Sequence, residues 1–222
     1  MRAHDPRDAR TDRRLVELRY DAFANSQWPT ETAPFPETAD LFPDAESIPE
    51  INGTDLDATR LRSAILNHGA LIVRGLFGAD QTAGLRSGID KAFAGYDAIR
   101  PGTPRDQGAP WFVPFERYPE FGARGWVRGG GGVLAVDSPA CMYDMIEMFE
   151  SVDLRSVVDG FFGEQGVLLG KKWTLRRVAH DRGVPGDWHQ DGSFMGRDIR
   201  SLNLWVALTH CGDDAPGLDV VA

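Results

Sequence analysis

The chain has little cysteine, no long apolar run and no excess of basic residues, and each absence excludes a class of protein. Its two cysteines, Cys141 and Cys211, form no Cys-x-x-Cys pair, which excludes a disulfide framework and a zinc finger. No stretch reaches the roughly 18 apolar residues of a spanning helix, and residues 1–20 lack the apolar segment of a secretory signal. A net charge of -9 argues against nucleic acid as the main partner. We therefore expect a cytoplasmic protein without a nucleic-acid or membrane partner, and its oligomeric state stays open.

The spacing of apolar residues changes along the chain from helical to strand-like. Helical spacing predicts helices within residues 1–27, over 58–68, from 80 to about 95, from 139 onward and through 154–161. Apolar runs and alternation predict strands at 70–73, 166–170, 171–179, 201–209 and 217–221. Helices followed by strands predict an α+β fold. Five prolines between residues 28 and 49 predict an irregular arm, so we divide the chain into residues 1–47 and 48–222.

Local signals predict where several helices begin and end. Asp57 is expected to cap the helix over 58–68, and Gly69 is expected to end it. The pair Ser138–Pro139 is a typical helix start. In the first helix, the apolar residues that recur at helical spacing are Leu15, Leu18, Ala22 and Phe23.

Two motifs fail as catalytic signatures. The glycine-rich run Arg128–Gly132 lacks the lysine and hydroxyl residue of a phosphate-binding loop, so it predicts a flexible loop. No Gly-x-Ser-x-Gly elbow is present, which argues against a serine hydrolase built on Ser193 and His189. The aromatic stretch 100–132 is expected to pack over a pocket.

His189 and Asp191 form the most informative pair in the sequence. In an extended segment, residues two positions apart project to the same side, so both side chains can reach one metal ion. A neutral imidazole and a carboxylate suit Fe(II), and a second histidine would complete a common oxygenase site. His180 and His210 are candidates for that ligand. The alternative interpretation of the pair is a loop histidine hydrogen-bonded to a nearby acid.

The surroundings of this pair resemble a known family. Trp188–Asp191 is followed by Leu202–Leu208 and then by Pro216–Leu218, a series similar to the phytanoyl-CoA dioxygenase family of Fe(II)/2-oxoglutarate oxygenases. Upstream, Gly69–Phe77 resembles the N-terminal portion of that family. The resemblance covers roughly residues 48–222.

The resemblance implies a fold, two cofactors and a site. The fold would be a double-stranded β-helix, or jelly roll, here partial and packed against N-terminal helices. Fe(II) would bind His189 and Asp191, and the co-substrate 2-oxoglutarate would contact Gln190, Trp205 and Lys172. The reaction would couple decarboxylation of 2-oxoglutarate to hydroxylation of a small organic molecule or an acyl thioester. No catalytic residue beyond the metal ligands is predicted.

In the family a distal histidine and an arginine follow the motif, but this sequence ends at Ala222. We therefore expect residues 48–222 to lack the C-terminal strands and the chain to be weakly active or inactive. One alternative is a non-catalytic jelly-roll remnant that acts as a binding module. Another is a different cupin-like metal enzyme that recruits His180 or His210 as its third ligand.

Overall fold

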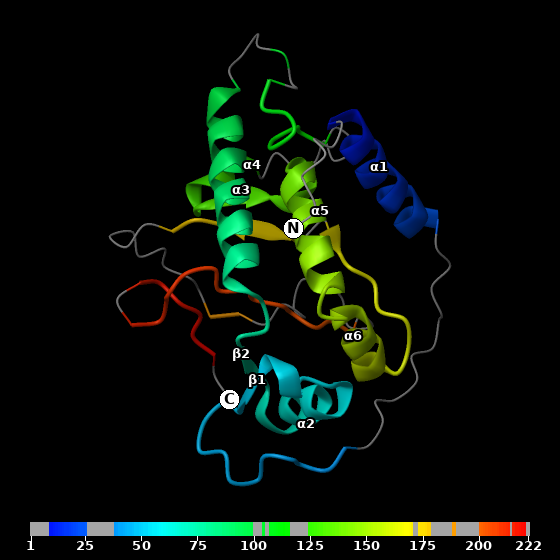
Figure 1. The fold of residues 1–222 in the computed structure, drawn as a ribbon, viewed down its shortest axis with the longest axis vertical. Coiled ribbons are helices and arrows are strands. Elements are labelled where there is room, and N and C mark those ends of the chain that lie inside the picture. The colour runs from blue at the N-terminus through cyan, green and yellow to red at the C-terminus, as the bar shows by residue number, and fades with distance from the viewer. Residues whose placement is uncertain are drawn as a thin grey trace.

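The computed structural model describes a mixed helical and stranded protein (Figure 1). The described residues are 9–25, 38–99, 104, 107–115, 124–170, 173–178, 188–189, 200–213 and 215–220. Within them the strands form two separate two-stranded sheets, β1–β2 and β3–β4, and no jelly roll is present. The described part therefore agrees with an α+β class at the level of helix and sheet content. No helix in this part is long and apolar enough to cross a membrane.

The first sheet belongs to a strand–helix–strand unit formed by β1 (Glu50–Asn52), α2 (Ala58–His68) and β2 (Ile72–Arg74). The two strands are parallel, and parallel neighbours need a crossover connection, which α2 provides. The Asp57 side chain accepts a hydrogen bond from the Arg60 amide at 2.7 Å, and Gly69 ends the helix in the left-handed conformation with φ 77°. Both predicted ends of α2 are thus confirmed.

The main core lies between two long helices and the second sheet. The helices are α3 (Ala79–Ala98) and α5 (Pro139–Glu150), and the sheet pairs β3 (Gly132–Leu134) with β4 (Thr174–Arg176) in antiparallel register. In Figure 1, α3 and α5 stand side by side across these strands. The buried side chains of the two helices include Leu85, Ile89, Phe93, Met142 and Met145.

Helix α6 (Leu154–Phe162) connects this core to α2. It ends at Gly163, a glycine in the left-handed conformation with φ 72°. Arg62 on α2 donates from Nε to the carbonyl of Phe161 at 3.1 Å and from its terminal nitrogen to the carbonyl of Gly160. These bonds satisfy carbonyl groups that the end of a helix leaves without an intrahelical partner.

Helix α1 (Ala9–Asn25) forms as predicted but buries a different face. Val16 is 3% exposed and joins the core cluster, and Asp12, one turn earlier, is also buried. Leu15 and Leu18, whose spacing predicts the helix, are 40% and 46% exposed and lie outside its buried face. The helix packs on α5 through the face that contains Val16. The face that contains Leu15 and Leu18 is also apolar, so the sequence alone does not indicate which face is buried.

Most of the predicted C-terminal strands are absent from the part of the chain that the structure describes. β2 and β4 confirm segments of the strands at 70–73 and 171–179, but 166–170, 201–209 and 217–220 join no sheet there. Alternating side chains are enough to predict an extended conformation. A strand also needs a partner for its main-chain hydrogen bonds, and the sequence pattern does not supply that partner.

The glycine-rich run is also ordered differently from the prediction. Residues Arg124–Gly129 form the short helix α4, and Gly132 opens the buried strand β3. Gly131 makes the turn between them with φ 77°, and its carbonyl accepts a hydrogen bond from the Arg177 amide at 2.8 Å. The prediction of a flexible loop over Arg128–Gly132 is therefore wrong, because a tight helix-to-strand turn uses the same glycines.

Candidate functional site

The predicted metal motif is only partly within the described residues. Trp188 is 70% exposed, and His189 is also exposed, so its imidazole is reachable from solvent. Asp191, Gln190 and Lys172 lie outside the described residues, as does His180. That His189 and Asp191 bind the same metal ion thus remains a prediction.

Across the described ranges, no three His, Cys, Asp or Glu side chains gather in a group that could hold a metal ion. The described residues alone therefore contain no complete Fe(II) site. A site at His189 needs at least one ligand from a residue beyond them, and Asp191 meets that requirement by its position in the motif.

Trp205 lies on an extended segment whose side chains alternate between the core and solvent. Leu202, Val206 and Leu208 are half-buried, and the last two pack against the core cluster. Trp205 is 49% exposed on the opposite side, as the alternation predicts. Leu204 departs from the pattern, since it is 47% exposed although it belongs to the inward series. The segment thus presents Trp205 to solvent rather than to the core.

His210 sits just after this segment beside a carboxylate. Its Nε2 lies 3.2 Å from Oδ2 of Asp213, and both side chains are largely exposed. Metal-binding histidines commonly pair one ring nitrogen with a carboxylate, and His210 makes such a pair with Asp213. A surface hydrogen bond between two exposed side chains explains the same geometry.

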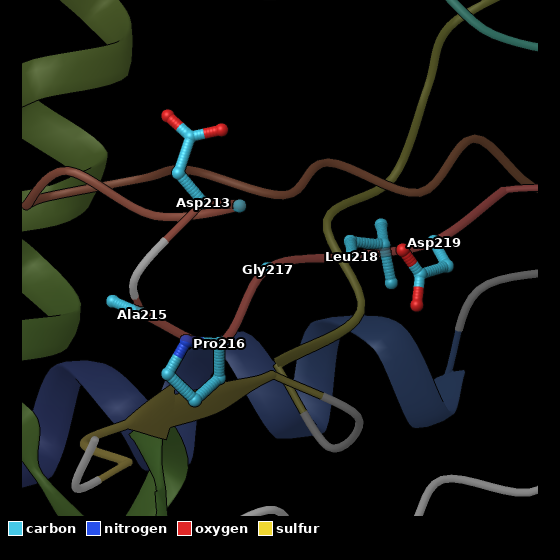
Figure 2. A pocket seen from close by; sticks show the side chains of 7 residues that line it. Asp213, Ala215, Pro216, Gly217, Leu218 and Asp219 are labelled. Atoms are coloured by element: carbon cyan, nitrogen blue, oxygen red, sulfur yellow. The ribbon is translucent and has the colours of Figure 1, made fainter.

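A shallow hollow of about 330 Å³ lies in the turn after His210. It is lined by residues from a single short stretch: Gly212, Asp213, Ala215, Pro216, Gly217, Leu218 and Asp219. The stretch folds back on itself through a 2.8 Å hydrogen bond from the Gly212 amide to the Ala215 carbonyl. Figure 2 shows that the carboxylates of Asp213 and Asp219 do not point toward one another. The hollow contains neither His189 nor Trp205, so we do not treat it as the site.

A buried ion pair is the strongest polar feature that sequence reasoning missed. Asp137 is 1% exposed and accepts bonds from Arg124 Nε at 2.7 Å, from Arg124 Nη2 at 2.9 Å and from the Phe115 amide at 2.8 Å. The hydrogen bond to Asp137 raises the pKa of Arg124, so the guanidinium remains charged at neutral pH. The only sequence signal is an acid at the end of the apolar run Gly132–Val136. This pair fixes α4 to the core.

A row of aromatic rings orients the strand that precedes the motif. The rings of Phe77 and Phe149 are 5.9 Å apart, and Trp173 stacks on Phe149 at 5.8 Å with an interplanar angle of 14°. Trp173 and Leu175 lie on the same side of the strand, toward the helices. The start of β4 is therefore held firmly just after the predicted co-substrate residue Lys172.

Of the two cysteines, Cys141 offers no reactive site. Cys141 is fully buried in α5, and burial raises the pKa of its thiol to about 12. A thiol that stays protonated at neutral pH is a poor nucleophile and a poor metal ligand. Cys211 is half-buried and stands apart from it as a free thiol.

Comparisons of the chain with protein-family models, curated proteins and solved structures give no match. Function is therefore argued from the motif residues and from the described structure around them.

Proposed function

We propose that this chain carries the metal-binding motif of an Fe(II)/2-oxoglutarate-dependent dioxygenase that hydroxylates a small organic molecule or an acyl thioester. In this proposal His189 and Asp191 bind iron, and Gln190, Trp205 and Lys172 contact 2-oxoglutarate. The sheet β3–β4 and the extended segment 201–209 would belong to the β-layers of a partial jelly roll. The observation that carries the proposal is the sequence Trp-His-Gln-Asp followed by an alternating apolar segment.

Three features of the described residues support this assignment. The His189 side chain is exposed, so a metal ion can reach it from solvent. Trp205 is on the outer side of a segment anchored by Val206 and Leu208, which leaves its ring available to a ligand. The aromatic stack at Trp173 holds the strand next to Lys172 in a fixed direction.

Each residue in the proposal has a distinct task. His189 would bind the metal as a neutral imidazole and Asp191 as a carboxylate, a donor set suited to Fe(II). The ammonium group of Lys172 would attract a carboxylate of 2-oxoglutarate, and the indole of Trp205 would form an apolar wall beside it. Bound Fe(II) would supply the redox chemistry that couples co-substrate decarboxylation to hydroxylation.

Metal binding tests the proposal without requiring turnover. We expect Co(II), added without oxygen and followed by its visible absorption, to bind the wild-type chain, and His189→Ala or Asp191→Ala to weaken binding by at least tenfold. His68→Ala is the matched control, because His68, the last residue of α2, already pairs with Asp40 at 3.0 Å and is not among the proposed ligands. Equal Co(II) affinities for His189→Ala and His68→Ala would contradict the assignment.

The same Co(II) titration distinguishes the two alternatives, a cupin-like metal enzyme and a non-catalytic binding module. If His210→Ala or His180→Ala weakens Co(II) binding as much as His189→Ala, that histidine is the third ligand and a cupin-like enzyme is favoured. If the wild-type chain binds no Co(II), the non-catalytic binding module is favoured. An assay of 2-oxoglutarate decarboxylation with Fe(II) then measures whether the bound metal is active, and strong turnover would contradict the expectation of a weakly active chain.

A further inference from the structure

The two sides of strand β4 carry different kinds of side chain. Trp173 and Leu175 face the helices, and Leu175 is 2% exposed. Thr174 and Arg176 alternate with them along the strand and therefore project to the opposite side. β4 thus directs a hydroxyl and a guanidinium away from the core.

The neighbouring strand β3 leaves the space beside Arg176 open. Residues opposite one another in an antiparallel pair have side chains on the same side of the sheet. Leu134 stands opposite Thr174 and is 4% exposed, so this side is covered at one end. Gly132 stands opposite Arg176, and a Cβ on this glycine would lie 2.7 Å from Cγ2 of Thr174. No side chain of β3 therefore lies beside the guanidinium, and Arg176 is exposed.

The next residue, Arg177, is an arginine with a structural role. Its Nη1 donates to Asp90 at 2.9 Å, and its guanidinium lies 4.5 Å from the centre of the Phe93 ring. Within the described residues, Arg176 makes no hydrogen bond, ion pair or ring contact. Acidic partners are not scarce, since the chain has 33 acidic residues against 24 Lys and Arg. The N–H donors of Arg176 are therefore available to a ligand.

We propose that Arg176 binds an anionic group of the substrate, a carboxylate or a phosphate, so that the molecule hydroxylated is an anion. This inference rests on the proposed function, in which the sheet β3–β4 belongs to a partial jelly roll and its side away from the helices faces the interior. A guanidinium binds carboxylate and phosphate oxygens through pairs of N–H donors. Thr174, on the same side, adds a hydroxyl donor. Lys172 has the co-substrate as its ligand in the proposed function, so Arg176 serves the substrate.

Three probes of the same chain length test this role: butyrate, butyl phosphate and uncharged butanol. The full-length chain is loaded with Co(II) and saturated with 2-oxoglutarate without oxygen, and binding is followed by the Nε–Hε signals of its arginines in nuclear magnetic resonance spectra. We expect at least one anion to bind at least tenfold more tightly than butanol and to shift the Arg176 signal. Preference for butyrate indicates a carboxylate substrate, and preference for butyl phosphate indicates a phosphate.

Arg176→Gln should abolish the preference for the anion, because it removes the charge-assisted hydrogen bonds. Arg177→Gln is the matched control, since it makes the same change of charge one position along the chain, on the side of α3. Equal binding of butanol and both anions to the wild-type chain would overturn the proposal, as would an equal loss in the two variants. If Arg176→Gln weakens 2-oxoglutarate binding and leaves the probes unaffected, the arginine serves the co-substrate and the proposal is wrong.

The Co(II) affinity of the same samples separates this inference from the proposed function. Arg176→Gln should bind Co(II) as tightly as the wild-type chain, because Arg176 is not a metal ligand. A wild-type chain that binds no Co(II) contradicts the oxygenase assignment itself. A chain that binds Co(II) but shows no preference for an anion contradicts only the role of Arg176.

Discussion

The helical body from α2 to α6 and the C-terminal segments 200–220 differ in how their main chains are satisfied. In the body, caps such as Asp57 and long-range bonds such as that from Arg62 close the helix ends. The C-terminal segments keep the side-chain alternation of strands but join no described sheet. Helices can complete their hydrogen bonds alone, whereas strands depend on a neighbour. The comparison indicates that substitutions in the helical body should change the free energy of unfolding more than substitutions in the C-terminal segments.

The largest expected effect is at the buried ion pair of the body. Asp137→Ala leaves the half-buried Arg124 guanidinium without its carboxylate and the Phe115 amide without its acceptor, which should lower the free energy of unfolding by about 3 kcal/mol. Asp219→Ala, at an exposed carboxylate of the C-terminal part, should change it by less than about 0.5 kcal/mol. Urea unfolding followed by far-ultraviolet circular dichroism measures both. Equal effects for the two variants would remove the proposed difference between the regions.

Replacing two glycines of the helical body by alanine should change stability in opposite directions. A Cβ at Gly160 of α6 would lie 2.6 Å from that of Ala58, so Gly160→Ala should destabilise the α2–α6 contact by about 1–3 kcal/mol. A Cβ at Gly84 of α3 meets nothing within 4 Å, so Gly84→Ala should stabilise the helix by about 0.5–1 kcal/mol. Thermal unfolding of both variants checks the signs. Destabilisation by Gly84→Ala would show that the surface of α3 is more crowded than described.

A smaller effect than that of the ion pair concerns the cap of α2, and it depends on pH. Asp57→Ala should cost about 1 kcal/mol at pH 7. The hydrogen bond from the Arg60 amide lowers the pKa of Asp57. A carboxylate with a lowered folded-state pKa stabilises the protein above its unfolded pKa, and this contribution is lost as pH falls through the folded value.

The difference in stability between wild type and Asp57→Ala should therefore be constant near neutral pH and shrink below about pH 4. Urea midpoints measured at several pH values give this difference directly. A difference that stays constant down to pH 2 would mean that the carboxylate charge is not what caps the helix.

The sequence predicts the helices well because their signals are local. Asp57, Gly69 and Gly163 each act within one turn of the helix end they define. The strands are predicted poorly because a ladder depends on residues far apart, as in the pairing of Val133 with Leu175. The buried face of α1 is missed because its packing on α5 selects the stripe with Val16.

In the candidate site, too, contacts between distant residues cannot be predicted from the sequence, and local alternation predicts only part of the arrangement. The exposure of Trp205 does not follow from local alternation alone, since its neighbour Leu204 is almost equally exposed, 47% against 49%. The meeting of His189 with Asp191 stays a prediction, since Asp191 lies outside the described residues. The Arg124–Asp137 pair joins two elements across the core, and no local pattern indicates that they meet.

The bond from Arg62 to the end of α6 has a consequence for the order of folding. The two residues that it joins, Arg62 and Phe161, are separated by 99 positions. Bringing such distant parts of a chain together costs loop-closure entropy before the contact returns any stabilisation. The unit of β1, α2 and β2 can form early from its own short crossover, and its docking onto α6 then becomes a late step that waits for the intervening helices.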